Sequence, residues 1–177
     1  MIRTEKTWRR GVVIALVAAA ATVVGASNAS ATGTDKTENL ILATGLLDGQ
    51  NEMVVCLDIV SGTLKGFVIN TNSRQFFAQY TAPSVAADLN VAKGRNPKYS
   101  LVTGISTFKP TGGGGRLGQC VIYVAEESSG NMVAYAVPWD PSAMSRNQPI
   151  NAPFVKLGVV KVGAGGPAAG GAVPAGN

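Results

Sequence analysis

One pattern of residues occurs twice in this chain, and that duplication limits the fold more than any other feature of the sequence. Residues 42–45 (LATG) recur as residues 101–104 (LVTG), and each copy continues through a loop into an apolar run. Each run ends in an acidic residue, followed by a short gap, a Ser-Gly pair and a further apolar run. Because these landmarks recur in the same order, we expect two similar structural units.

The repeated runs have the length and composition of β-strands. The predicted strands lie at 42–45, 53–58, 63–69 and 76–80 in the first copy and at 101–104, 120–125, 131–137 and 154–162 in the second. Between the copies, Pro83 and Ser84 precede the apolar residues Val85 and Leu89, a pattern that predicts a short helix. We therefore predict a mostly β fold: two pseudo-repeats of three to four antiparallel strands with one short helix between them, arranged as a sandwich, a barrel-like body or a partial propeller.

The Ser-Gly pairs predict tight turns between strands. Glycine after serine can adopt the positive φ that such a turn needs, and a carboxylate a few residues earlier can accept hydrogen bonds from free backbone N–H groups. The predicted turn-forming residues are Asp58, Ser61 and Gly62 in the first copy and Glu126, Ser129 and Gly130 in the second. We interpret Asp58 and Glu126 as turn formers, with a catalytic acid at either position as the alternative.

The chain has two cysteines, Cys56 and Cys120. Cys56 lies in an apolar run with Val54 on its own face and with Val55 and Leu57 on the other. A strand of this kind is covered on both faces or lies centrally in a packed sheet. Three interpretations of the cysteines stay open: a disulfide between Cys56 and Cys120, two free buried thiols, or a redox or metal-binding role.

The first thirty-odd residues have the organisation of an export signal. Arg3, Lys6, Arg9 and Arg10 make the start positive, and the apolar segment at 12–24 is shorter than the ~20 residues that span a bilayer. The sequence Ala-Ser-Ala at 29–31 predicts cleavage between Ala31 and Thr32. An uncleaved membrane anchor is the alternative, and the export route, general secretory or twin-arginine, stays open.

These features predict a map of the chain. We expect a signal peptide at 1–31, a flexible N-terminus at 32–38, a single β domain at 39–162 and a disordered Gly/Ala/Pro-rich tail at 163–177. Within the β domain, the first repeat covers 39–97 and the second covers 98–162.

The positive charge of the chain does not indicate nucleic-acid binding. Removal of the signal takes away four basic residues and one acidic residue, which lowers the formal net charge from +5 to +2. The one dense basic cluster that remains, Lys93, Arg95 and Lys98, lies in a Gly/Asn/Pro-containing segment that predicts a solvated loop.

The residue types needed for several common chemistries are missing from the sequence. The chain contains no histidine, so Ser-His and Cys-His pairs cannot form, and two cysteines cannot build a four-cysteine zinc site. The loop at 48–52 lacks the alternating carboxylates of a calcium loop, and the glycine run at 112–115 lacks the Lys-Ser/Thr of a phosphate loop. The sequence therefore assigns no catalytic, cofactor-binding or metal-binding residue and no cofactor.

Residues 55–67, with an apolar strand, an acid, a Ser-Gly turn and an aromatic residue, resemble one blade motif of quinoprotein-type β-propellers. The second copy departs from that motif, because Glu126 replaces the aspartate and Tyr135 is shifted relative to the aromatic residue. Two repeats also cannot close a propeller, which needs roughly 4–8 blades. No cofactor-binding residue is carried over from this resemblance.

A longer resemblance covers most of the β domain. The chain is similar to small exported proteins of the planctomycete type, which combine a signal peptide with the motifs found here at 42–45, 57–66, 96–104, 112–115 and 121–139. That resemblance implies export and the β architecture, and it implies no activity.

From the sequence we expect an exported, non-catalytic structural or binding protein of the cell envelope, located in the periplasm, in the envelope or outside the cell. Its partner is an unknown protein or a second copy of the chain, and it contacts a membrane only if the signal segment stays uncleaved. The alternatives are an enzyme or cofactor-binding fragment of propeller type, and a membrane-anchored accessory subunit. An enzyme is expected to gather several titratable groups in one cleft, whereas a binding module is expected to expose an apolar patch or a sheet edge.

The predicted cleavage can be tested on the protein purified from its own cells. We expect an intact mass that begins at Thr32, because the Ala-Ser-Ala segment precedes it. Mass spectrometry of the whole chain measures this, and a mass that retains residues 1–31 in a membrane fraction would support the anchor instead.

Overall fold

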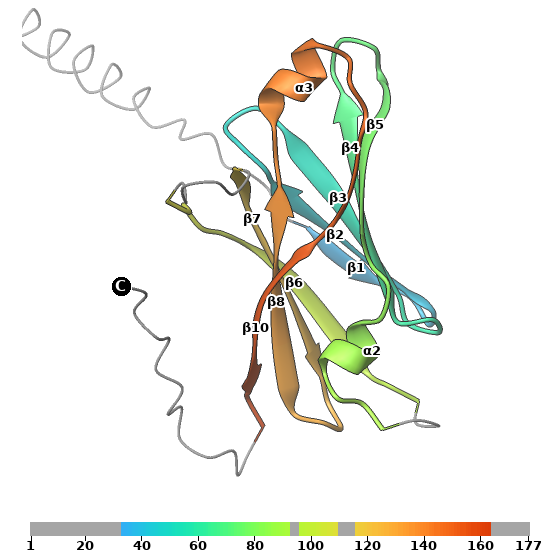
Figure 1. Ribbon diagram of the computed structural model, residues 1–177. Helices are drawn as coiled ribbons and strands as arrows, with labels where there is room; N and C mark the ends of the chain where they lie inside the picture. Colours follow the sequence, from blue (N-terminus) through green and yellow to red (C-terminus); the bar gives the residue numbers. More distant parts are fainter. Residues whose placement is uncertain (1–32, 93–95, 110–115, 164–177) are drawn as a thin grey trace, which may run out of the picture. The chain divides into compact units, whose positions relative to one another are not determined.

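The computed structural model describes residues 33–92, 96–109 and 116–163 (Figure 1). The predicted signal with its cleavage site at Ala31 and Thr32, the glycine run at 112–115 and the tail from 164 onward lie outside the described residues. In the part of the chain that is described, no helix is both long enough and apolar enough to cross a membrane.

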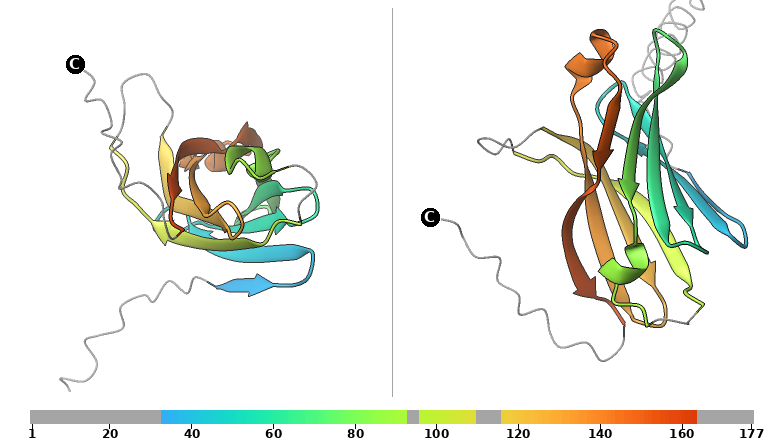
Figure 2. Two further views of the ribbon diagram at one scale, coloured as in Figure 1. Left: turned by 90° about the horizontal axis from the view of Figure 1, so that it is seen from below. Right: turned by 45° about the vertical axis from the view of Figure 1, so that its right-hand side comes forward.

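Ten strands in the described residues form two sheets, which confirms the prediction of a mostly β fold. Sheet A has the order β1 (Thr34–Lys36), β2 (Leu40–Leu46), β3 (Glu52–Asp58), β4 (Thr63–Asn70), β5 (Gln75–Ala82) and β9 (Ile150–Pro153). Sheet B has the order β10 (Val155–Lys161), β8 (Asn131–Pro138), β7 (Leu117–Glu126) and β6 (Tyr99–Ile105). Of the three predicted arrangements the structure is the sandwich (Figures 1 and 2).

Two short helices and one short strand occupy the connections. The predicted helix is α2 (Val85–Asp88), and the Ser84 hydroxyl caps it by accepting a hydrogen bond from Ala87 N. A second helix, α3 (Pro141–Ser145), was not predicted; Asp140 caps it and proline fits its first turn. Within the segment at 32–38, residues 34–36 form the strand β1, which was not predicted and pairs antiparallel with β2.

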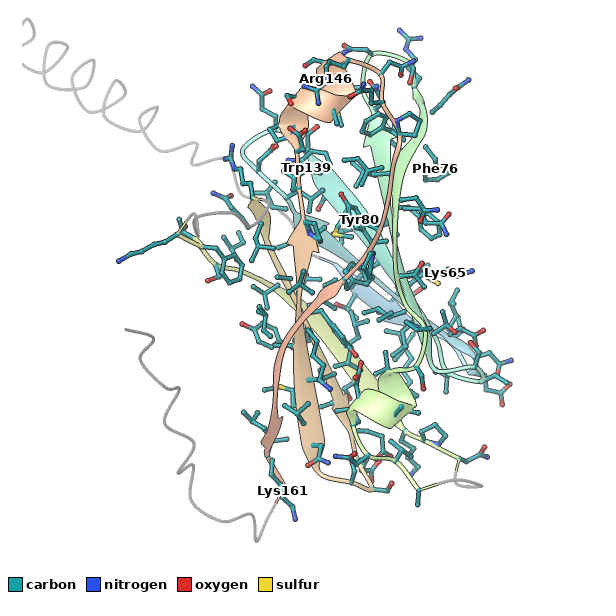
Figure 3. All side chains as sticks on the ribbon, viewed as in Figure 1. Lys65, Phe76, Tyr80, Trp139, Arg146 and Lys161 are labelled. Atoms are coloured by element: carbon teal, nitrogen blue, oxygen red, sulfur yellow. The ribbon has the colours of Figure 1, made fainter. Side chains whose placement is uncertain are left out.

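The core lies between the two sheets, where the inward side chains of both are buried. Figure 3 shows Tyr80 pointing into this space, and Tyr80, Tyr135 and Trp139 are among its largest buried residues. The sheets approach closely where β2 passes β6 and β7: a Cβ on Gly45 would collide with the Cys120 sulfur. At the same place Thr103 Oγ1 donates a hydrogen bond to the carbonyl oxygen of Thr44.

The last two strands join the sheets at a second place. Strand β9 pairs parallel with β5 in sheet A, and one residue later β10 pairs antiparallel with β8 in sheet B (Figure 1). The residue between them, Phe154, is buried, and its ring centroid lies 5.8 Å from that of Tyr80 and 6.2 Å from that of Tyr135. Gly66 makes room for it, since a Cβ there would lie 2.8 Å from Phe154 Cζ. The predicted strand at 154–162 thus corresponds to β10, whereas β9 was not predicted.

Candidate functional site

The side of sheet A that faces away from sheet B carries a group of apolar side chains, which we call the outer face of sheet A. Along β2 to β5 these residues alternate with core residues, as the two-residue period of a strand requires. The apolar members of the outer face include Leu42, Val54, Cys56, Phe67, Ile69 and Phe76. Phe76 is 73% exposed and Ile69 is 52% exposed, and Figure 3 shows Phe76 and Lys65 on this outer side.

The outer face of sheet A decides between the two alternatives predicted for the strand at 53–58. Strand β3 is central in sheet A, between β2 and β4, as one of the two predicted alternatives requires. It is covered on one face only by the described residues: Val55 and Leu57 are fully buried, whereas Val54 is 40% exposed. Apolar residues on both faces of a strand therefore do not show here that both faces are packed.

The strand register aligns one row of residues across the outer face. Thr44 lies opposite Val54, Val54 opposite Phe67, Phe67 opposite Gln79 and Gln79 opposite Asn151. The row thus crosses β2, β3, β4, β5 and β9. Its first residues carry a hydroxyl group and apolar groups, and its last two, Gln79 and Asn151, carry amides. Residues directly opposite each other in neighbouring strands are close enough for one ligand to contact both.

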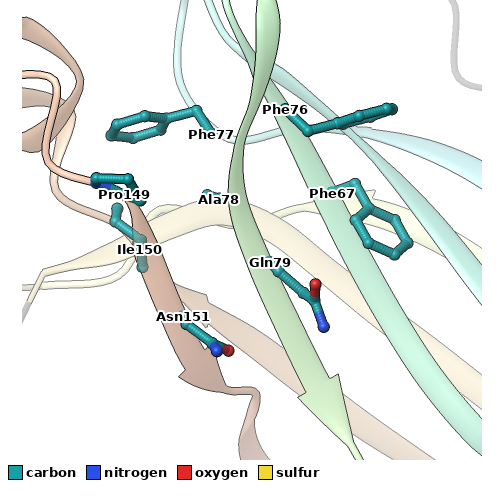
Figure 4. A pocket seen from close by; sticks show the side chains of 8 residues that line it. All are labelled: Phe67, Phe76, Phe77, Ala78, Gln79, Pro149, Ile150 and Asn151. Carbon is teal, nitrogen blue, oxygen red and sulfur yellow. The ribbon is translucent and has the colours of Figure 1, made fainter.

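One end of this row opens into a pocket of about 490 Å³, which we call the β5–β9 pocket. Its lining residues are Phe67, Phe76, Phe77, Ala78, Gln79, Pro149, Ile150 and Asn151. Figure 4 shows Phe67, Phe76 and Gln79 on one side of the β5 ribbon, with Phe77 on the other and Asn151 on the neighbouring strand β9. A volume of this size is within the range of about 300–1,000 Å³ that is usual for small-molecule sites.

The chemistry of the β5–β9 pocket is aromatic and amide. None of its eight lining residues carries a titratable side chain. The rings of Phe67 and Phe76 meet edge to face, with centroids 5.8 Å apart and an interplanar angle of 64°. The pocket can therefore contact apolar groups with its rings and exchange hydrogen bonds through its amides, and its lining supplies no acid or base for proton transfer.

The other end of the row has a second hollow, of about 330 Å³, beside β1. It is lined by Gly33, Thr34, Asp35, Leu42, Ala43, Thr44 and Val54. Thr44 N donates to Gly33 O at 3.0 Å, and Gly33 N donates to Thr44 Oγ1 at 3.2 Å, so backbone pairing holds the first described residues beside this face.

The structure places Asp58, Ser61 and Gly62 in the turn between β3 and β4. Asp58 Oδ1 accepts hydrogen bonds from Val60 N at 2.9 Å and from Ser61 N at 3.2 Å. The hydrogen bonds from Ser61 lower the pKa of the Asp58 carboxyl below its ordinary value. Gly62 has a φ of +66° and its N–H donates to Asp58 O at 2.8 Å, so the turn depends on a left-handed residue there.

Glu126, Ser129 and Gly130 occupy the same positions in the turn between β7 and β8. Glu126 is 2% exposed, and its carboxylate accepts hydrogen bonds from Ser128 N at 3.0 Å and Ser129 N at 2.7 Å. Gly130 has a φ of +63° and donates to Glu126 O at 3.0 Å. Burial would raise the pKa of Glu126, but the hydrogen bonds from Ser128 and Ser129 outweigh it and hold this pKa at about 2. Asp58 and Glu126 thus perform the same structural task in both turns.

The structure contains no bridge between Cys56 and Cys120, and both are free thiols. Cys56 lies on the outer face of sheet A, whereas Cys120 is fully buried between the sheets beside Gly45. Of the three interpretations left open by the sequence, the disulfide is not the one found in this structure, because the two side chains lie on opposite sides of sheet A. Burial raises the pKa of both thiols, that of Cys120 to about 12, which disfavours the reactive thiolate.

Two further carboxylates are already occupied by donors of the chain itself. Asp48 accepts hydrogen bonds from Gln50 N at 2.9 Å, Asn51 N at 2.8 Å and Trp139 Nε1 at 2.7 Å, so the loop at 48–52 serves as a cap on Trp139. Within the described residues no group of three or more His, Cys, Asp or Glu side chains is arranged to hold a metal ion.

The second carboxylate, Asp88, belongs to a polar cluster that joins α2 to sheet B. It accepts a hydrogen bond from Tyr135 Oη at 2.6 Å and one from Lys156 Nζ at 2.8 Å. Asn131 Nδ2 donates to Leu89 O at 2.8 Å close to the end of the same helix. These bonds fasten α2 to β8 and β10, which is a structural role.

Glu126 makes the stability of the protein depend on pH in a defined window. A folded pKa of about 2 against an ordinary value of 4.5 adds stability above pH 4.5 that is lost as the pH falls from 4.5 toward 2. We expect Glu126→Gln to lower the free energy of unfolding at neutral pH by up to about 3 kcal/mol and to flatten its pH dependence in that window. Urea denaturation at a series of pH values measures this, with Glu127→Gln as the control. Equal losses in wild type and Glu126→Gln between pH 4.5 and 2 would contradict it.

The pocket residues were not predicted as a site from the sequence. Phe67, Phe76 and Gln79 lie in predicted strands, but the outward direction of a strand that is apolar on both faces cannot be read from its sequence. Comparison of the chain with protein-family models, with curated proteins and with solved structures finds no match, so the site rests on its own geometry.

Proposed function

We propose that the chain is an exported, non-catalytic binding protein of the cell envelope that contacts its partner with the outer face of sheet A. The observation that carries this proposal is that the apolar side chains of the outer face of sheet A continue into the β5–β9 pocket, where Phe76, 73% exposed, belongs to both. A soluble domain gains nothing for its own stability by exposing such a side chain. Contiguous exposed apolar patches are therefore typical of interaction sites.

Export is supported by the start of the sequence. A positive segment, a short apolar heart and an Ala-Ser-Ala cleavage pattern follow one another before Thr32. The formal charge of +2 that remains after cleavage provides little attraction for nucleic acids or anionic membranes. We therefore propose a location in the periplasm, in the envelope or outside the cell.

The choice between a binding module and an enzyme rests on the kind of residue that lines the pocket. Catalysis of proton or group transfer needs titratable or nucleophilic side chains that converge in one cleft. The eight residues of the β5–β9 pocket are aromatic, aliphatic or amide, which favours recognition over chemistry. The Asp88 cluster, which does gather titratable groups, already has its charges paired within the fold.

The form of the sheet edges also favours binding through the face. The edge strands of sheet A are β1, three residues long, and β9, four residues long and ending in Pro153. Short edge strands and proline reduce the tendency of an edge to pair with other chains. The outer face of sheet A has no such protection over Phe67, Ile69 and Phe76, so a partner gains most by covering the face.

The proposal predicts that the purified protein sediments with the envelope fraction of its own cells. We expect Phe76→Ser to weaken this association about 10-fold or more, because an exposed ring that becomes buried in a complex contributes about 1.5–3 kcal/mol. The control is Val60→Ser, since Val60 is 78% exposed but lies in the β3–β4 turn outside the pocket. The fraction bound is measured over a range of envelope concentrations.

Both substitutions affect exposed side chains, so thermal melts of the variants are expected to match wild type. Equal binding by wild type and Phe76→Ser would remove the outer face of sheet A as the binding surface. Absence of any association with the envelope fraction would contradict the proposed function itself.

A further inference from the structure

We propose that the β5–β9 pocket binds a neutral polysaccharide chain, with its rings packed on the sugar and its amides bonded to the sugar hydroxyls. This inference rests on the proposed binding function and names the class of partner for the same surface. It is carried by three properties of the pocket: its lack of charge, its pair of amides and its edge-to-face pair of rings, of which Phe76 is 73% exposed.

The lining of the pocket matches an uncharged ligand. None of its eight residues is acidic or basic, so a charged group that entered the pocket would lose its hydration without gaining an ionic partner. A neutral polyol does not carry that penalty. This match of charge separates a neutral glycan from an anionic polysaccharide, a nucleic acid or a phosphorylated ligand.

Gln79 and Asn151 provide the polar half of the site. They lie directly opposite each other in the paired strands β5 and β9, and Gln79 is directly opposite Phe67 of β4, so the three side chains lie on the same face of sheet A. Figure 4 shows Gln79 on β5 and Asn151 on the neighbouring strand β9. Within the described residues neither side-chain amide has a hydrogen-bond partner in the chain. Each amide offers two N–H donors and one carbonyl acceptor, a set that matches sugar hydroxyls, which both donate and accept.

Phe67 and Phe76 provide the apolar half. Their edge-to-face contact, with an interplanar angle of 64°, leaves the two rings facing different directions and forming a corner. Sugar rings have C–H groups on their faces, and these polarised hydrogens pack favourably against the electron-rich face of an aromatic ring. Aromatic side chains also lose little conformational entropy when they are covered.

The position of the amides favours a glycan over an extended peptide. Peptides that bind to sheets usually add a strand to a free edge and use backbone hydrogen bonds. Inside the pocket, β5 is already paired on both edges, with β4 and with β9. The free edge of β9 is only four residues long and ends in Pro153, so it offers little to an extended peptide. On the face of the sheet, the hydrogen-bonding groups of the pocket are the side-chain amides of Gln79 and Asn151.

The test is affinity electrophoresis of the protein purified from its own cells through gels that contain soluble xylan, glucomannan, dextran or alginate, with sedimentation on cellulose and chitin. We expect at least one neutral polysaccharide to retard or retain the protein, and alginate to have no effect. We expect Phe76→Ala and Gln79→Ala each to weaken that binding at least 10-fold. The matched controls are Val60→Ala and Gln75→Ala, because Gln75 is an exposed glutamine of the same strand outside the pocket.

Three results would overturn the inference. They are no binding of any neutral polysaccharide, binding of alginate as strong as that of the neutral polymers, and equal binding by Gln79→Ala and Gln75→Ala. The proposed function is tested separately, by the sedimentation of the protein with the envelope fraction. If the neutral polymers fail but Phe76→Ser still weakens envelope sedimentation, the surface binds a partner of another class, such as a protein. If envelope sedimentation fails too, both proposals fall.

Discussion

The packing of Phe154 is the contact on which the rest of the structure depends. This residue lies where the chain passes directly from strand β9 of sheet A to strand β10 of sheet B. Strand β9 ends at Pro153 in one sheet and β10 begins at Val155 in the other, so Phe154 lies where the two layers are joined by the chain itself. Its ring packs between Tyr80 of sheet A and Tyr135 of sheet B, over the space that Gly66 leaves free. Loss of a buried ring of this kind typically costs about 3–5 kcal/mol, a large part of the stability of a domain of this size.

The same crossing creates the candidate site. Because β9 adds to the edge of β5 before the chain turns at Phe154, Asn151 comes to lie opposite Gln79, and Pro149 and Ile150 form one wall of the pocket. Without β9, the aromatic residues of the outer face would keep the Gln79 amide beside them but would lack both Asn151 and the wall formed by Pro149 and Ile150. The core contact and the binding surface therefore have a common origin, and a change that frees β9 is expected to affect both.

The features that could be predicted from the sequence are those set by residues close together in the chain, and the features that could not are set by pairing between distant segments. The strands β2 to β4 and β6 to β8, the helix α2 and the turns at Gly62 and Gly130 depend on residues close together in the chain. The apolar runs, the Pro-Ser pair before the helix and the Ser-Gly pairs that predict them are visible in the sequence. Strand β1 (Thr-Asp-Lys) has no apolar pattern and is defined by its pairing with β2, and β9 pairs in parallel with a strand about seventy residues earlier. A disulfide between Cys56 and Cys120 could not be decided from the sequence, because the decision depends on the side of sheet A on which each cysteine lies. The internal duplication of the sequence stays a prediction.

The most direct measurement of the crossing is native-state hydrogen exchange on wild type, on Phe154→Leu and on Phe76→Leu. If Phe154 holds both sheets together, Phe154→Leu lowers the protection of amides in β9 and in β10 together, by a similar opening free energy of about 1–2 kcal/mol. Phe76→Leu, a change of the same chemistry on an exposed ring, leaves both strands as in wild type. Independent opening of β9 and β10, or unchanged protection in Phe154→Leu, would show that the two sheets are held together elsewhere.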